Sequence, residues 1–140
     1  MASDNNGSRN RTALVGRVLI ASMFIPSGLG KIFGFAAIVG YIASHGVPLP
    51  EICAAVAVAV ELGLGLALLV GWQARQAAWG LAIFVAVVTP IFPNFWALPR
   101  AEAMLQMQSF IKNIAVIGGL LLIAAFGSGR FSLDGRPGRP

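Results

Sequence analysis

The sequence predicts an all-helical integral membrane protein built as a bundle of four transmembrane helices. Hydrophobic residues make up 57% of its 140 residues and charged residues only 11%, about half of the roughly 25% typical of soluble domains. The apolar residues are also gathered in four long blocks, whereas a soluble domain of this length would bury them in one compact core. Lipid is therefore the solvent that suits this chain.

The four predicted spans are residues 12–34, 50–70, 76–92 and 110–126. Each is near the roughly 20 residues that a helix needs to cross the hydrocarbon core. The first ten residues are polar and lack apolar periodicity, so we expect residues 1–11 to form a disordered cytoplasmic segment. Residues 12–134 then form the membrane domain, and residues 135–140 form a cytoplasmic tail.

Two longer connections join these spans. Residues 35–49 combine apolar positions suited to the membrane interface with a Gly-Val-Pro-Leu-Pro turn. In the connection 93–109, the polar stretch 101–108 predicts a short interfacial helix. Within the first span, Pro26 and the small residues that follow it are expected to kink and interrupt the helix just before Lys31.

Lysine and arginine residues orient the predicted bundle. Seven fall on the side of the termini: Arg9, Arg11, Arg17, Arg75, Arg130, Arg136 and Arg139. Three fall on the opposite side: Lys31, Arg100 and Lys112. This asymmetry predicts that both termini lie in the cytoplasm of a bacterial inner membrane. The net charge of +5 thus belongs to membrane flanks, which argues against nucleic acid as a partner.

Small residues spaced along the spans predict close helix packing, because helices associate in lipid where their backbones can approach. The second span carries such a seam, and the third and fourth carry shorter ones. The predicted seams are Ala55, Ala59, Gly63 and Ala67; Ala78, Ala82 and Ala86; and Ala115 with Gly119. In the second span, Ala57 and Gly65 flank Glu61 on nearly the opposite face, so both faces are expected to pack.

Glu61 is the most informative residue, since it lies near the midpoint of an otherwise apolar span. An unpaired carboxylate there would cost several kcal/mol or stay protonated. The candidate partners are Lys31, Lys112 with Asn113, and Arg17. Counting about 1.5 Å per residue along each helix, depth in the membrane favours Lys112, whose long stem can reach inward.

Two readings of these residues stay open. In the first, Glu61, Lys112, Asn113 and Lys31 line a polar pocket that opens outward and holds a small polar molecule such as a quinone head group. In the second, they form a structural ion-pair network. Lys31 also has a simpler interpretation, in which its ammonium reaches up to the outer interface.

The remaining polar residues predict little chemistry. Cys53 and His45 are the only cysteine and histidine, which excludes an intramolecular disulfide and bis-histidine haem ligation, and we expect no intrinsic metal site. His45 is interpreted as a solvated loop residue. Arg130 and Asp134, in the segment GSGRFSLD after the fourth span, are expected to pair locally at the membrane surface.

Seven sequence blocks, read in order, resemble the DoxX family of small bacterial and archaeal membrane proteins. They are RVLIASMFIPSGLGKIFGF, GVPLPE, VELGLGLALLVGW, QAAWGLAIF, IFPNFW, QSFIKNIAVIGGLLLI and GSGRFSLD. The resemblance runs from about Arg17 to Asp134 and implies a four-helix membrane architecture. It places Lys31, Glu61, Lys112, Asn113 and the last of these blocks on the family's recurring polar positions. Many relatives carry histidine where this chain has Pro93, so no role of that histidine applies here.

The resemblance implies a membrane subunit associated with a quinone-linked or thiol and sulfur oxidoreductase complex, and not an enzyme on its own. Any electron transfer would need a bound quinone or a partner subunit bearing the redox centre. The expected partners are the lipid bilayer and redox or sulfur-metabolism proteins. Two alternatives stay open: a small-solute carrier, which with four helices would need to form a homo-oligomer, and a purely structural assembly subunit.

Overall fold

The computed structural model describes residues 2–92 and 95–135, and within them the chain is helical, with no strand. The helices are α1 (Ala2–Phe33), α2 (Phe35–Ser44), α3 (Pro50–Val70), α4 (Ala74–Val88), the short 3₁₀ helix η1 (Phe95–Ala97) and α5 (Arg100–Phe126). Pro93, Arg136 and Arg139, which the sequence interpretation used, lie outside these residues.

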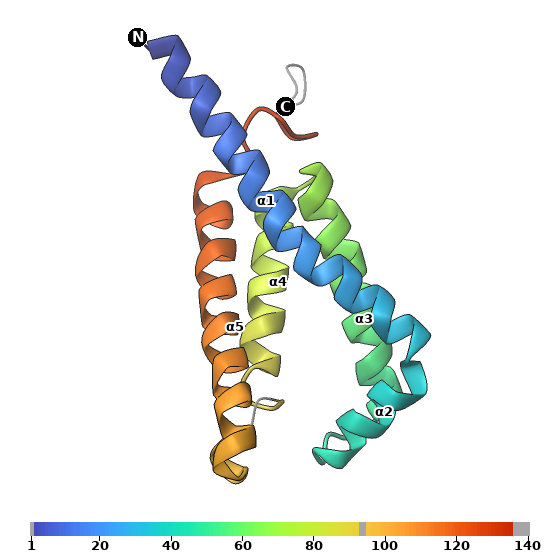
Figure 1. Ribbon diagram of the computed structural model, residues 1–140. Helices are drawn as coiled ribbons and strands as arrows, with labels where there is room; N and C mark the ends of the chain where they lie inside the picture. The colour runs from blue at the N-terminus through green and yellow to red at the C-terminus, as the bar shows by residue number, and fades with distance from the viewer. Residues whose placement is uncertain (1, 93–94, 136–140) are drawn as a thin grey trace.

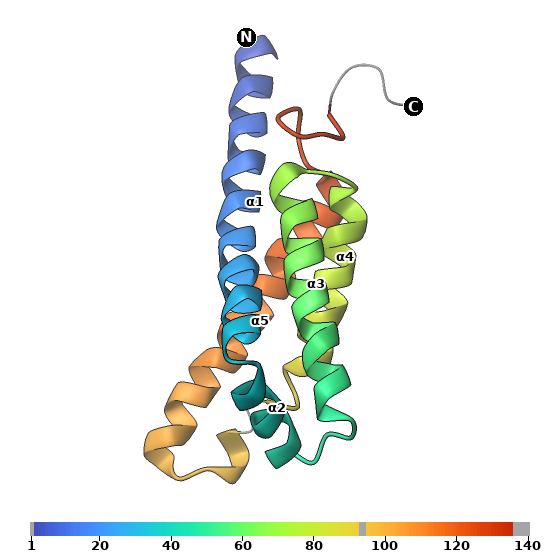
Figure 2. The same cartoon turned by 90° about the vertical axis from the view of Figure 1, so that its right-hand side faces the viewer.

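Four of the helices form the bundle: α1, α3, α4 and α5 (Figure 1). The start of α1 and the segment that follows α5 lie at the same end, and α2 lies at the opposite end (Figures 1 and 2). The predicted all-helical class is confirmed, and α1, α3 and α5 are long and apolar enough to cross a membrane. The chain therefore ends at the same end of the bundle where it began, as is required when it passes along the bundle an even number of times.

The structure adds a fifth helix to the four predicted spans, because the connection 35–49 contains a helix of its own. Helix α2 has ten residues and extends about 15 Å, half of what the hydrocarbon core demands. Helix α4 has 15 residues and is shorter than the predicted span 76–92. It ends at Val88 because Pro90 has no N–H with which to continue the helix.

Three features of the helices differ from the prediction: the start of α1, its continuity at Pro26 and the start of α5. Helices elongate easily once they have formed. Helix α1 already begins at Ala2, so the first residues extend it instead of being disordered. It also continues through Pro26 without interruption, as membrane helices do when one lost hydrogen bond is tolerated. The stretch 101–108 is no separate interfacial helix but the first turns of α5, in which alanine, glutamate, leucine and glutamine favour helix.

The predicted packing seam of α3 is wrong, because the opposite face is the buried one. Of the four predicted seam residues only Ala67 is buried, whereas Ala55, Ala59 and Gly63 are exposed. The buried residues of α3 are Ala54, Glu61, Gly65, Ala67 and Leu68. In the other helices, Ala78 and Ala82 are buried as predicted, while Ala86 and Ala115 are exposed.

Helix α1 packs against the Glu61 face of α3 through two glycines. A Cβ atom on Gly65 would lie 3.3 Å from side-chain atoms of Phe24 and Ile25. A Cβ atom on Gly28 would lie 2.7 Å from Cγ of Leu62, so any larger residue there would displace the Leu62 side chain or the helices themselves. The two glycines therefore set the spacing between α1 and α3.

The segment 127–135 folds back over the turn between α3 and α4 (Figure 2). The backbone N–H groups of Leu133 and Asp134 donate to the carbonyl oxygens of Val70 and Gly71 at 3.1 and 3.0 Å. The Asp134 carboxylate accepts hydrogen bonds from the backbone N–H groups of Gln73 and Ala74, both at 2.9 Å. The expected local pairing of Asp134 with Arg130 is wrong: Asp134 caps the start of α4, where a carboxylate is favoured.

Arg17 lies beneath this segment and is only 1% exposed. Its guanidinium donates to the carbonyl oxygen of Phe131 in the C-terminal segment, and more weakly to that of Leu68 in α3 at 3.4 Å. Gly71, at a positive φ of 71°, leaves room for it, since a Cβ atom there would overlap Nη1 of Arg17. Arg17 thereby joins α1 to α3 and to the end of the chain.

Replacing Asp134 with alanine should lower the free energy of unfolding by about 1 kcal/mol, because two N–H groups at the start of α4 lose their acceptor. Thermal unfolding of the detergent-solubilised protein measures the change as a fall of a few degrees in Tm. The control is Glu102→Ala, which removes an exposed carboxylate from α5. Equal melting of the two variants would contradict the capping role.

Candidate functional site

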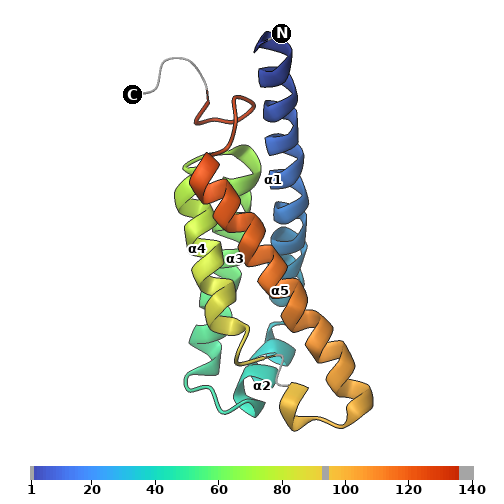
Figure 3. The ribbon, with the colours of Figure 1, turned by 90° about the vertical axis from the view of Figure 1, so that its left-hand side faces the viewer.

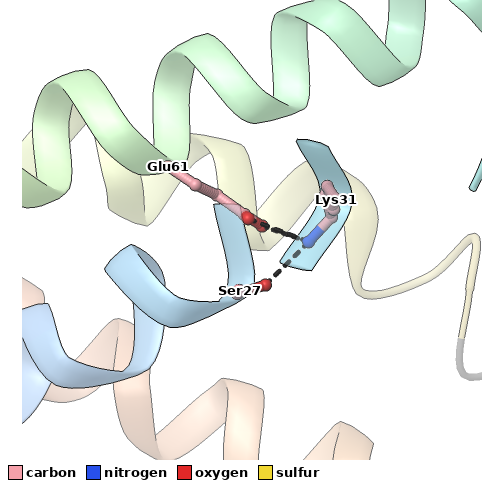
Figure 4. Close-up of polar contacts among 3 residues, drawn as sticks. All are labelled: Ser27, Lys31 and Glu61. Atoms are coloured by element: carbon pink, nitrogen blue, oxygen red, sulfur yellow. Dashed lines mark hydrogen bonds and ion pairs between the residues drawn. The ribbon is translucent and has the colours of Figure 1, made fainter. Parts of the chain in front are cut away.

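The candidate site is built around Glu61, whose side chain projects from the middle of α3 and is 8% exposed. Nζ of Lys31, in the last turn of α1, lies 3.0 and 2.8 Å from Oε1 and Oε2 of Glu61. The same amino group donates to Oγ of Ser27 at 2.7 Å. Figure 4 shows this amino group between the carboxylate and the hydroxyl. The three donors of the ammonium thus have three acceptors.

The local sequence of α1 makes this pair possible. Gly28 lies one turn before Lys31 and would bring a Cβ atom within 3.3 Å of Cβ of Glu61. Because glycine leaves that space free, α1 approaches α3 closely enough for the Lys31 stem to reach the carboxylate. The spacing of four residues between Ser27 and Lys31 places both side chains on the same face of α1.

The prediction that Lys112 is the partner of Glu61 is wrong. Among the described residues the one ion pair joins Lys31 to Glu61. Depth along the membrane normal does not specify which helices touch, and α1 is the helix that packs against Glu61. Lys31 therefore does not reach up to the interface: its side chain is 21% exposed and turned toward α3. The third candidate, Arg17, bonds to backbone carbonyls elsewhere.

A cavity of about 270 Å³ lies beside this pair, between α1, α3, α4 and α5. Its polar lining residues are Ser27, Glu61, Lys112 and Asn113. Its apolar lining residues are Met23, Phe24, Phe84, Val85, Val88 and Val116. Three of the four predicted site residues, Glu61, Lys112 and Asn113, thus line the same cavity. The fourth, Lys31, is joined to it through its ion pair with Glu61. Ligand binding at these residues stays a prediction.

Thr89 is a part of this site that sequence reasoning missed. Its hydroxyl is buried and accepts a hydrogen bond from Nδ2 of Asn113 at 3.0 Å. This bond joins the end of α4 to α5 and orients the Asn113 side chain. One signal was present: Thr89 is the only hydroxyl-bearing residue in residues 76–92.

His45 also differs from its interpretation as a solvated loop residue. It follows α2 directly, is partly buried, and lies with Tyr41 and Phe92 in an aromatic cluster. Its ring centroid is 4.5 Å from that of Tyr41 and 5.4 Å from that of Phe92. Nδ1 of His45 lies 2.8 Å from the Tyr41 carbonyl oxygen. The cluster joins α2 to the segment that follows α4.

The cavity can hold a small molecule with both polar and apolar parts. Lys112 and Asn113 are hydrogen-bond donors, the charge of Glu61 is balanced by Lys31, and the remaining walls are aliphatic and aromatic. Among the described residues no three His, Cys, Asp or Glu side chains gather where they could hold a metal. Binding of a polar head group is the chemistry that these residues favour.

Replacing Lys31 with methionine should lower the free energy of unfolding by about 3 kcal/mol, because the buried Glu61 carboxylate loses its counterion. The double variant Lys31→Met/Glu61→Gln should recover much of this loss, since no buried charge remains. Lys112→Met is the control and should cost less than about 1 kcal/mol, the usual value for an exposed cation. Tm values are compared for the wild type, the single variants Lys31→Met and Glu61→Gln, the double variant and the control. Strictly additive effects of the Lys31 and Glu61 substitutions would contradict the pairing.

Comparison with known proteins agrees with this architecture. The family model described as DoxX matches residues 12–94, which confirms the resemblance seen in the sequence. Inner membrane protein YqjF of Escherichia coli (strain K12) is 37% identical over 125 residues, covering 86% of this chain and 88% of YqjF. Inner membrane protein YphA of the same organism is 30% identical over 133 residues, covering 95% of each chain.

A weaker similarity reaches a eukaryotic protein. The ER-derived vesicles protein ERV29 of Saccharomyces cerevisiae is 24% identical over 132 residues, which cover 94% of this chain but 36% of ERV29. No solved structure matches the chain. The family model and the two inner membrane relatives, which align over most of their length, together show that this helical membrane protein belongs to the DoxX family.

Proposed function

We propose that this protein is a multi-pass protein of a bacterial inner membrane and a subunit of a larger complex. In this proposal it binds the head group of a membrane quinone in the cavity beside Glu61. The observation that carries the proposal is the cavity itself, which combines ionisable and amide side chains with apolar walls inside a membrane bundle. Ionisable groups at membrane depth are by default candidates for a functional site.

The chemistry of the lining suits a quinone ring. Its two carbonyl oxygens accept hydrogen bonds, which Lys112 and Asn113 can donate. Phe24 and Phe84 offer aromatic surface for the ring. The volume of about 270 Å³ is near the lower limit of roughly 300 Å³ for small-molecule sites, so it suits a head group without its isoprenoid tail.

The tail has a route to the lipid between α1 and α5. Met23 and Ser27 on α1 and Lys112 on α5 line the cavity and are also exposed at the surface. An opening bounded by these residues faces the hydrocarbon, where a quinone tail dissolves. A quinone would therefore enter sideways from the bilayer.

The redox partner is proposed to be a separate protein. This chain has one cysteine, Cys53, and one histidine, His45, so we assign the centre that exchanges electrons with the quinone to an oxidoreductase of thiol or sulfur metabolism. The excess of arginine at the end that carries the termini supports a cytoplasmic location of both termini.

A second candidate function is that of a purely structural assembly subunit. It is favoured by the Lys31 ammonium, whose three donors already have acceptors in Ser27 and Glu61. A network that is complete without a ligand needs none to stabilise it. Binding measurements separate the two candidates, because the structural role predicts no quinone affinity at Lys112 or Asn113.

Purified protein should bind ubiquinone-1, a short-tailed quinone, and Lys112→Ala should weaken this binding about 10- to 100-fold. The physical reason is the loss of one charge-assisted hydrogen bond, about 1.5–3 kcal/mol. Equilibrium dialysis in detergent measures the dissociation constants. Arg100→Ala is the matched control, since it removes a cation from the same helix outside the cavity. Unchanged affinity in Lys112→Ala and Asn113→Ala would overturn the assignment.

A further inference from the structure

Two further cavities, separate from the one beside Glu61, lie at the end of the bundle that carries the N-terminus. The first, of about 500 Å³, is a groove between α1 and α5. Its apolar part is lined by Ala13, Gly16, Ile20, Gly119, Leu122, Ile123 and Phe126. Figures 1 and 3 show the N-terminal half of α1 passing beside the last turns of α5 at this end. We call this the α1–α5 groove.

The outer end of the groove is polar and basic. Ser8, Arg9 and Thr12 line it there, and a neighbouring cavity of about 420 Å³ continues it between α1 and the C-terminal segment. The neighbouring cavity shares Arg9, Ala13, Phe126 and Gly127 with the groove and adds Asn6, Asn10, Gly129 and Arg130. The Arg130 backbone N–H donates to Oδ1 of Asn10 at 3.1 Å, which holds the two walls together.

Arg9 and Arg130 bring two positive charges to the outer end of the groove. Among residues 6–92 and 95–135, whose side chains the structure describes, no carboxylate lies within salt-bridge distance of either. The carboxylate of Asp134 lies on a different cavity and is bonded to the start of α4. Two guanidinium groups with amide and hydroxyl neighbours match a phosphate, which they can contact through several donors.

The length of the groove distinguishes a lipid from a soluble anion. From Arg9 to Ile20 the α1 wall extends for about 16 Å, close to the ~15 Å thickness of one hydrocarbon leaflet. A polar outer end and an apolar channel that together extend over the depth of one leaflet have the shape of a phospholipid, head group first. A free phosphate would leave the apolar part of the groove empty.

We propose that the α1–α5 groove binds one acyl chain of an anionic phospholipid, with its phosphate between Arg9 and Arg130. Gly16 lies at the centre of the channel and has no atom within 4 Å of the position of a Cβ, which leaves the space that the chain fills. Basic pockets between membrane helices bind anionic lipid head groups in this manner. The site is separate from the quinone cavity and does not depend on it.

Native mass spectrometry of the delipidated full-length protein tests the proposal by titration with phosphatidylglycerol and phosphatidylcholine of identical acyl chains. The wild type should prefer phosphatidylglycerol about thirtyfold, the combined effect of two basic residues near the head group. Arg9→Gln/Arg130→Gln should lose this preference. Arg11→Gln, which removes a neighbouring exposed arginine that does not line the cavities, should keep it.

The acyl-chain part of the proposal has its own variant. Gly16→Leu places an apolar side chain in the groove, from a position where a Cβ atom meets no neighbour, and should weaken binding of both lipids. Its matched control is Gly118→Leu, another glycine with open space at the Cβ position but outside the groove. Circular dichroism and gel filtration establish that the variants remain folded. Equal binding of the two lipids by the wild type, or equal lipid binding by Gly16→Leu and Gly118→Leu, would overturn the proposal, as would full competition by inorganic phosphate.

Discussion

The hydrocarbon core of a bilayer offers no water to a polar side chain, so a carboxylate inside a helix bundle needs its partner within the bundle. Glu61 meets this constraint through Lys31, and the pair determines how α1 and α3 lie against each other. Gly28 provides the close approach that the pair requires. The ion pair and the glycine contact are therefore one structural feature, because each requires the spacing that the other sets.

Where α3 ends, a second buried charged group is also satisfied within the bundle, by different partners. Arg17 is buried and bonds to carbonyl oxygens of α3 and of the C-terminal segment. That segment in turn caps α4 through Asp134. Helices α1 and α3 are thus joined by polar contacts at two levels, Lys31 with Glu61 and Arg17 with Leu68, and by glycine packing between them. No comparable polar contact joins α1 to α5 among the described residues, and both proposed binding sites lie along that seam.

Hydropathy predicted the bundle because the free energy of placing a span in lipid is a sum over its residues. That sum depends on which residues the span contains and not on which helices it contacts. The partner of Glu61 could not be predicted in this way, since Lys31 and Lys112 are both cations near its depth. Only the packing of α1 on α3 distinguishes them. The α3 seam failed for a related reason: small residues occupy both faces of that helix, and sequence does not say which face meets α1. Helix α2 was missed because ten mostly apolar residues suit an irregular interfacial segment or a helix equally.

The seam between α1 and α5 is divided into two compartments by one contact. A Cβ atom on Gly119 would lie 3.1 Å from Cδ1 of Ile20, so the two helices meet closely there. The α1–α5 groove lies on one side of this contact, toward the termini, and the Glu61 cavity begins one turn beyond it at Met23 and Phe24. Each compartment lies in its own half of the bundle. A phospholipid in the groove would therefore leave the cavity accessible, and a quinone entering the cavity would not displace it.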